Sequence, residues 1–205
     1  MELQHHFTSP FGFFTNKKLI SGLKKHIYEE KVAGIDSKCA TNLKKNLKES
    51  KFNFFNNDEK IIIDTKTFIT DSLIQLLNKI QKEKLFYKIR FNESWFHIGK
   101  TNSIHETHTH PNCSWCGIYF IQIGDKGINK GSGETVFINP VYPNHHDWGT
   151  RYIDQLRIQP EDGLLVLFPS YLNHHQSIYT GNKDRIVIAF NMSVLLNKSF
   201  SAILM

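Results

Sequence analysis

Imidazole, carboxylate and thiol groups are concentrated in one stretch of the chain, His105–Gln122. Its first twelve residues contain three histidines, one glutamate and two cysteines. His108 and His110 are two residues apart, so on an extended strand both imidazoles point to the same side. Two imidazoles on one side of a strand make half of a metal site, and further ligands must come from elsewhere.

The best source of further ligands is a second histidine-containing run, Phe-Pro-Ser-Tyr-Leu-Asn-His-His, which ends at His174 and His175. Arg185 follows eleven residues after His174 and begins another strand-like segment. A guanidinium suits a carboxylate because its planar fork can donate two parallel hydrogen bonds. One face of that segment is small and polar, as expected of a barrel wall that faces a ligand: Arg185, Val187, Ala189 and Asn191.

Two kinds of periodicity divide the chain. Helical spacing predicts three helices in the first part, at residues 16–30, 37–47 and 65–82. From Phe86 the period becomes two, with strand patterns at residues 86–98, 117–123, 134–138, 164–168 and 185–192. Short strands at this spacing indicate a sandwich or jelly roll. We therefore expect one α+β domain over 1–205, with mainly helical support in 1–85 and a jelly-roll core in 86–205.

Composition limits the function. The chain has 205 residues, 40% of them hydrophobic, and a formal net charge of +6. The lysines of the first segment are read as a solvated helix face, since no basic stripe with interleaved aromatics supports nucleic-acid binding. We find no signal-peptide pattern and no apolar run of roughly 18 residues that would span a bilayer. Three cysteines do not form a disulfide framework, so we expect a cytoplasmic protein.

Four motifs resemble one known family, the 2-oxoglutarate/Fe(II)-dependent oxygenases related to prolyl hydroxylases. They fall in the family's order and cover about residues 90–192: His108-x-His110-Pro, Gly117-Ile-Tyr-Phe, Leu167-Phe-Pro-Ser-Tyr-Leu-x-His174, and Arg185-Ile-Val-Ile-Ala-Phe-Asn191. The Phe-Pro-Ser-aromatic-Leu-x-His run, with an arginine eleven residues later, is specific, whereas His-x-His alone is not.

The resemblance implies a double-stranded β-helix that holds Fe(II) and takes 2-oxoglutarate as co-substrate. In such enzymes oxygen drives decarboxylation of 2-oxoglutarate to succinate and CO2 while the substrate is oxidised, commonly by hydroxylation. By position, Arg185 meets the distal carboxylate of 2-oxoglutarate. Strand parity and the resemblance together point Tyr119 and Asn191 toward the same pocket.

The sequence departs from the family's usual ligand set at one position. Most members use two histidines and a carboxylate, but His110 stands here at the position of the aspartate. Since imidazole also suits iron, we expect His108, His110 and His174 to be the metal ligands. Glu106 shares the strand parity of the first two and can serve as a ligand or as an acceptor that orients an imidazole.

Other functions use the same residues. A structural zinc can be held by His108, His110, Cys113 and Cys116, which leaves His174 and Arg185 unexplained. The two cysteines can also be a redox pair or simply buried thiols. The jelly roll can be a non-catalytic ligand-binding module, or a cupin-like three-histidine enzyme that does not use 2-oxoglutarate and has no use for Arg185. Neither the substrate, whether peptide or small molecule, nor the oligomeric state can be derived from the sequence.

Three further histidines are not predicted to be metal ligands. His97 is read as a surface or satisfied core residue. His145 and His146 fall in a long polar loop, and such loops can cover binding sites.

Overall fold

The computed structural model describes residues 9–34, 44–82, 85–125, 130–140 and 155–196. Two helices and a short 3-10 turn accompany nine strands in these ranges. In chain order the elements are β1 (Gly12–Thr15), α1 (Ile20–Gly34), β2 (Lys44–Glu49), η1 (Phe54–Asn56), α2 (Lys60–Gln81), β3 (Tyr87–His108), β4 (Trp115–Gln122), β5 (Thr135–Ile138), β6 (Gln155–Ile158), β7 (Leu164–Pro169), β8 (His174–Tyr179) and β9 (Arg185–Leu196).

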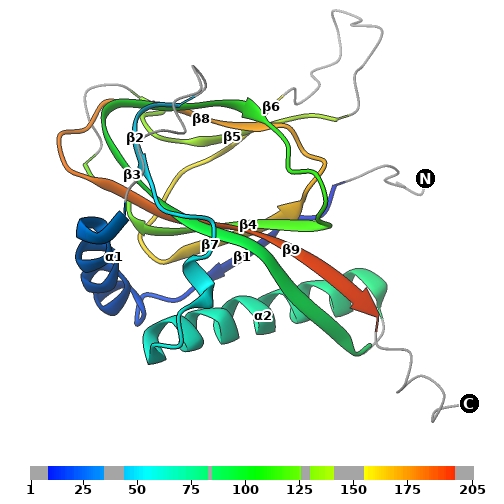
Figure 1. The fold of residues 1–205 in the computed structure, drawn as a ribbon. Helices are drawn as coiled ribbons and strands as arrows, with labels where there is room; N and C mark the ends of the chain where they lie inside the picture. Colours follow the sequence, from blue (N-terminus) through cyan, green and yellow to red (C-terminus); the bar gives the residue numbers. More distant parts are fainter. Residues whose placement is uncertain (1–8, 35–43, 83–84, 126–129, 141–154, 197–205) are drawn as a thin grey trace, which may run out of the picture.

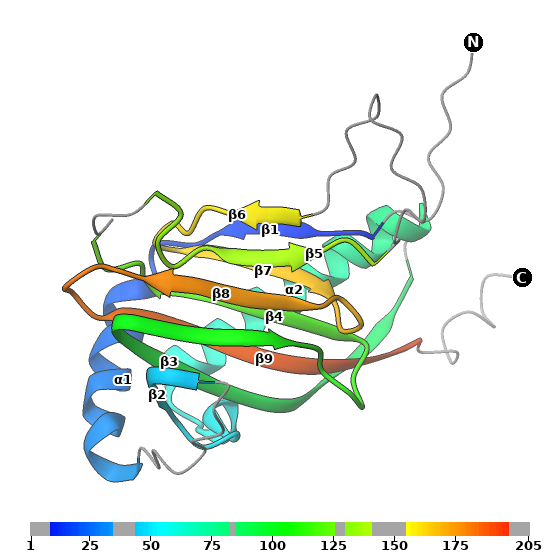
Figure 2. The ribbon, with the colours of Figure 1, turned by 90° about the horizontal axis from the view of Figure 1, so that it is seen from above.

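The strands form one curled sheet in the order β1-β7-β4-β9-β3-β8-β5-β6, with β2 paired to the outer side of β3. Neighbouring strands in this sheet pair antiparallel. The curl lays β8, β5 and β6 over β4, β7 and β9, so the sheet becomes two facing layers (Figures 1 and 2). This is the jelly-roll core of the double-stranded β-helix, and the predicted fold class is confirmed.

The long strand β3 joins the two layers. Its first part pairs with β9 as far as Gly99, opposite Arg185, and its last part pairs with β8 from Ser103 onward. The backbone of Asn102, just before the second part, has a left-handed φ of 63°. The pairing with β8 sets His108 directly opposite His174. Two segments that are 66 residues apart in sequence thus meet across one ladder.

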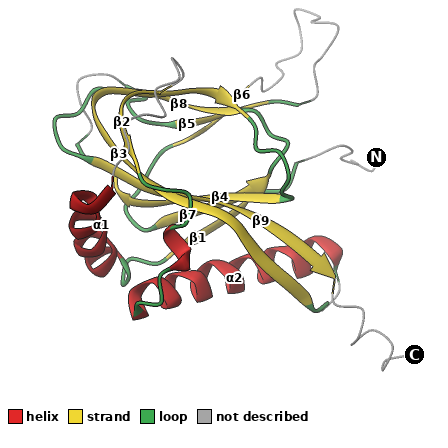
Figure 3. Cartoon of the chain, viewed as in Figure 1, coloured by secondary structure: helices red, strands yellow, loops and turns green. Residues whose placement is uncertain are grey.

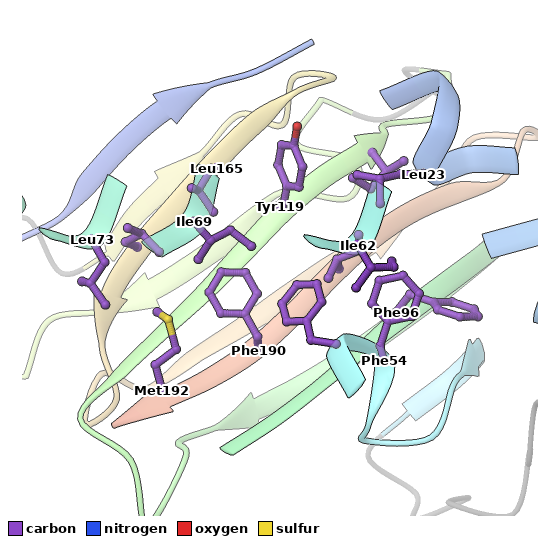
Figure 4. Packing of buried hydrophobic residues seen from close by; sticks show 14 of the residues in the cluster. Leu23, Phe54, Ile62, Ile69, Leu73, Phe96, Tyr119, Leu165, Phe190 and Met192 are labelled. Carbon is purple, nitrogen blue, oxygen red and sulfur yellow. The ribbon is translucent and has the colours of Figure 1, made fainter. Parts of the chain in front are cut away.

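The helices cover the outer face of only one layer (Figure 3). Apolar residues recur along α2 at helical spacing and turn the same face to the sheet, so that Ile62, Ile69 and Leu73 are fully buried. They pack on alternate residues of β4 and β9 (Figure 4). The residues that point the other way from the same strands join a second apolar cluster, inside the curl: Cys116, Phe120, Phe137, Ile158, Val166, Phe168, Leu172 and Val187.

Several sequence expectations change here. The helix predicted over residues 37–47 is wrong where the structure describes it, because Lys44–Glu49 is strand β2; residues 37–43 lie outside the described ranges. Pairing with β3 satisfies the backbone of this lysine-rich segment, which overrides its local propensity. The part of the chain before Phe86, expected to be mainly helical, contains strand β1 as well as β2. Strand β1 pairs with β7. The helix predicted at 65–82 begins five residues earlier, at Lys60.

None of the helices in the described part of the chain is long and apolar enough to cross a membrane.

Candidate metal centre

Three histidines converge between the two layers of the sheet. His108 ends β3, His110 follows it in the connection to β4, and His174 begins β8. One ligand atom from each lies within 4.8 Å of the other two. The ring centroids are 4.3 Å apart for His108 and His174, 4.9 Å for His108 and His110, and 5.2 Å for His110 and His174. One ion can therefore touch all three rings.

Backbone carbonyls orient two of these imidazoles in the same way. Nδ1 of His108 donates to the carbonyl of Glu106 at 2.8 Å, and Nδ1 of His174 donates to the carbonyl of Leu172 at 2.9 Å. A carbonyl oxygen only accepts, so these bonds put the ring proton on Nδ1. Each Nε2 then carries the lone pair that a metal requires.

Burial keeps His174 neutral. Its side chain is almost inaccessible and lies against the rings of Phe137 and Phe168, with centroids 5.5 and 4.9 Å away. Burial, together with the neighbouring imidazole of His108, lowers the pKa of His174 to about 3. An imidazole that is neutral at physiological pH can bind a metal without first losing a proton.

His110 packs on an aromatic side chain that is itself fixed. Its ring centroid lies 5.9 Å from that of Trp95. The indole N–H of Trp95 donates to Nε2 of His97 at 3.1 Å, and the same nitrogen contacts the carboxylate of Glu49. Trp95, His97 and Glu49 are all buried. Strands β3 and β2 thus provide a rigid wall beside His110.

Arg185 lies deeper in the same pocket, buried to 2% exposure. Its Nη1 donates to Oε1 of Gln176 at 2.7 Å and its Nε to the carbonyl of Gly133 at 3.2 Å. Burial lowers the pKa of Arg185 to about 10, which still leaves it charged at neutral pH. Among the described residues no carboxylate pairs with this guanidinium, so its charge faces the pocket uncompensated.

The donors present fit Fe(II). Three neutral imidazoles converge on one point, and imidazole is a good ligand for iron. Residues of β9 from Val187 to Asn191 line the same pocket as the imidazoles and Arg185. The pocket therefore has a three-histidine end and a cationic end.

Sequence comparison identifies the family. Residues 93–191 match the family model described as "Putative 2OG-Fe(II) oxygenase". This part of the chain, which includes the three histidines and Arg185, has the sequence of a 2OG-Fe(II) oxygenase. The protein is an oxidoreductase that depends on Fe(II) and 2-oxoglutarate. No curated protein matches the chain in sequence.

Solved structures share the fold of this oxygenase. A Pseudomonas putida prolyl-4-hydroxylase superposes with a TM-score of 0.62 at 11% identity, covering 91% of this chain and 94% of that one. HygX from Streptomyces hygroscopicus, with nickel and 2-oxoglutarate bound, has a TM-score of 0.59 at 10% identity, over 91% and 83%. A viral collagen prolyl hydroxylase from Paramecium Bursaria Chlorella virus-1, in complex with 2-oxoglutarate, has a TM-score of 0.56 at 13% identity, over 89% and 94%.

Two residues expected in the pocket of the oxygenase lie elsewhere. Tyr119 is fully buried on the opposite face of β4, where its ring is 5.7 Å from that of Phe68 and its hydroxyl donates to the carbonyl of Asn16 (Figure 4). The Glu106 side chain is exposed, because the β3–β8 register shifts between His105 and His108. Its backbone carbonyl, not its carboxylate, orients His108.

Asn191 does line the pocket. Its amide donates to Oε2 of Glu93 at 2.8 Å, and its Oδ1 accepts a hydrogen bond from the thiol of Cys116 at 3.3 Å. Neither cysteine sulfur belongs to the histidine cluster in the described part of the chain. The alternative zinc site, with His108, His110 and the two cysteines as ligands, therefore has no support in the geometry of the described residues.

Several residues that line the pocket were not predicted from the sequence, among them Trp95, His97 and Gln176. Trp95 and His97 alternate on one face of β3, and Gln176 is two residues after His174 on the same face of β8, so parity alone could have found them. His145 and His146 lie outside the described residues.

Proposed function

We propose that His108, His110 and His174 hold the Fe(II) of this oxygenase and that Arg185 binds the distal carboxylate of 2-oxoglutarate. Asn191 lines the same pocket. The reaction we propose is hydroxylation of a peptide or a small molecule.

The observation that carries the proposal is the uncompensated charge of Arg185. A buried cation is costly unless an anion pairs with it. Its hydrogen-bond acceptors in the described residues, Gln176 and the carbonyl of Gly133, are neutral, and its Cζ lies 5.5 Å from the centroid of the uncharged Phe120 ring. A carboxylate at the inner end of the pocket satisfies the guanidinium, and the imidazoles in the same pocket are then available to a metal that binds the other end of the co-substrate.

Each residue has a separate task in this arrangement. When bound, Fe(II) supplies a centre that chelates the keto acid and activates oxygen. The three imidazoles fix its position, and the carbonyls of Glu106 and Leu172 fix two of the imidazoles. The apolar side chains of Phe137, Phe168 and Val187 keep bulk water away from the inner pocket.

A third histidine in place of a carboxylate changes the charge of the site. Three neutral imidazoles leave the metal centre with both charges of Fe(II), whereas a carboxylate would remove one of them. The dianion of 2-oxoglutarate offsets one charge at the metal and the charge of Arg185, so that one positive charge remains at the metal. We therefore expect the co-substrate to bind strongly to the metal-loaded protein and weakly to the metal-free protein.

A cupin-like three-histidine enzyme that does not use 2-oxoglutarate is the second candidate. It accounts for the histidine cluster equally well, as does a non-catalytic metal-binding jelly roll. Neither gives a reason for a buried arginine that has no carboxylate partner among the described residues. The uncompensated guanidinium therefore favours the oxygenase that uses 2-oxoglutarate.

The structural neighbours are the reason for proposing either a peptide or a small molecule as the substrate. One is a prolyl hydroxylase from Trichoplax adhaerens in complex with a peptide fragment, and another is HygX with hygromycin B bound. The cytoplasmic location and the absence of a nucleic-acid partner stay predictions from composition.

Anaerobic titration of the Fe(II)-loaded protein with 2-oxoglutarate tests the proposal. We expect a charge-transfer absorption band, and equilibrium dialysis gives the affinity independently of that band. Arg185→Ala removes a charged hydrogen bond of about 1.5–3 kcal/mol, so the affinity for 2-oxoglutarate falls about ten- to a hundredfold while Fe(II) binding changes little. Arg185→Lys recovers part of the loss, because an ammonium lacks the fork.

Arg157→Ala is the matched control. Arg157 is a half-exposed arginine on β6 that pairs with Glu134, and its removal leaves the affinity for 2-oxoglutarate unchanged. If Arg185→Ala binds 2-oxoglutarate as tightly as the unmodified protein, Arg185 does not bind the co-substrate. That result would favour the cupin-like enzyme that does not use 2-oxoglutarate.

A further inference from the structure

Two thiols lie beside the pocket and take no part in the proposed function. Cys113 is in the connection between His110 and β4, and Cys116 is the second residue of β4. Their Sγ atoms are 3.7 Å apart. Cys113 is partly exposed, whereas Cys116 is buried to 1% exposure and lines the pocket.

The separation of the sulfurs is within reach of a covalent bond. A disulfide has an S–S distance of about 2.05 Å, so the two atoms need to approach by less than about 2 Å. Cys113 lies in a loop outside the strand ladder and provides the freedom for this movement. Its partial exposure also gives a small oxidant access to one of the two sulfurs.

Both thiols make hydrogen bonds that a disulfide would remove. The thiol of Cys116 donates to Oδ1 of Asn191 at 3.3 Å, and the thiol of Cys113 donates to the carbonyl of His110 at 3.5 Å. The first acceptor is a side chain of the pocket wall, and the second belongs to one of the three clustered histidines. Oxidation of the pair would therefore change one hydrogen bond to the pocket wall and one to the backbone of His110.

We propose that Cys113 and Cys116 form a reversible dithiol–disulfide modification site in the wall of the pocket, with a peroxide as the oxidant. The Cys113 sulfur attacks one oxygen of hydrogen peroxide; the O–O bond breaks, and a sulfenic acid and one water form. The Cys116 sulfur then attacks the sulfenic sulfur. The S–O bond breaks, the S–S bond forms, and the oxygen leaves with the thiol proton as a second water. Two thiols are oxidised and one peroxide is reduced.

The test follows the covalent state of the metal-free protein, which avoids iron-driven oxidation. A Cys39→Ser background leaves only this pair. After treatment with hydrogen peroxide, we expect intact mass to fall by two hydrogen atoms, peptide mapping to join Cys113 to Cys116, and dithiothreitol to restore both thiols. In Cys116→Ser, the reaction stops at a sulfenic acid on Cys113 that dimedone traps. A protein that gains oxygen atoms on either cysteine without forming the crosslink, or that keeps both thiols reduced, overturns the proposal.

The effect of the disulfide on 2-oxoglutarate binding is measured separately, and this part of the inference rests on the proposed function. The reduced and oxidised proteins are loaded with Fe(II) without oxygen and titrated with 2-oxoglutarate. Loss of the hydrogen bond to Asn191 weakens co-substrate binding by about two- to tenfold, and the Cys113→Ser/Cys116→Ser protein treated with peroxide shows no such change. Equal affinities in the two states remove the coupling, whereas a failure of 2-oxoglutarate to bind in either state contradicts the proposed function and leaves the covalent result standing.

Discussion

Adjacent histidines at the start of β8 have different surroundings. The imidazole of His174 faces His108 and His110, whereas His175 is half-buried and its Nδ1 lies 3.4 Å from the hydroxyl of Thr107. Successive residues of a strand point to opposite sides. Only His174 belongs to the three-histidine cluster of the described residues.

Single substitutions separate the two histidines. His174→Ala leaves two of the three imidazoles, so we expect it to abolish stoichiometric Fe(II) binding, whereas His175→Ala keeps the metal. Metal is counted after circular dichroism has shown that both variants are folded. The reverse result would mean that the register of β8 is shifted by one residue.

Burial of His174 also makes stability depend on pH. Its pKa is about 3 in the folded protein and about 6.5 in an unfolded chain. Between these values the unfolded chain binds a proton that the folded protein does not, so the free energy of unfolding falls as the pH is lowered. This single group removes about 2–3 kcal/mol between pH 7 and pH 4.5.

Urea denaturation of the metal-free protein at the two pH values measures this loss. His174→Gln does not titrate at this position, so its loss of stability over the same interval is smaller by the stated amount. Equal losses in the two proteins would show that His174 is protonated in the folded state at pH 4.5.

At the scale of the elements, strand β4 is held tightly between two neighbours. Gly117 pairs with Leu167 of β7 on one side and with Phe190 of β9 on the other. A Cβ at this position would collide with the Phe190 ring and would lie 2.9 Å from Cδ2 of Leu167. A glycine inside a strand often marks such a close approach.

Gly117→Ala therefore overpacks the sheet next to the pocket. We expect a loss of about 1–3 kcal/mol in the free energy of unfolding, measured by chemical denaturation. Lys88→Ala on the exposed side of β3 changes stability by less than about 0.5 kcal/mol and serves as the control. A Gly117→Ala protein as stable as that control would mean that β4 and β9 can move apart at no cost.

At the scale of the whole molecule, the sheet layer that contains β4, β7 and β9 packs against the helices with one face and lines the pocket with the other. One face packs on α1 and α2, and the other carries the pocket-lining row of β9. Substitutions on the helix side should thus change stability without changing the site.

Leu73→Ala tests this separation. Leu73 is fully buried in α2, so the substitution costs about 2–5 kcal/mol in the free energy of unfolding. We expect the folded variant to bind one Fe(II) with unchanged affinity in equilibrium dialysis. Ile63→Ala on the same helix is the control, since Ile63 is 47% exposed and its loss costs much less. Loss of metal from folded Leu73→Ala would show that the helix layer positions the histidines.

The sequence alone determined the features that depend on local periodicity and on chemically specific residues. Alternation along β9 separated Arg185, Val187, Ala189 and Asn191 from the apolar residues between them, because only one of its faces carries polar groups. The regular apolar spacing of α2 identified that helix. The two histidine-containing runs were recognised as parts of one site because few residue types bind metals.

Tertiary structure decided what local patterns leave undetermined. Both faces of β4 are apolar, one against the helices and one inside the curl, so parity could not choose the side of Tyr119. The irregular register between His105 and His108 breaks the strand alternation that predicts Glu106 on the same face as His108 and His110. Strand β2 exists because β3 offers it an edge, and the contact of Glu49 with His97 follows from that pairing. Such pairings join residues far apart in the chain, and only the folded sheet brings them together.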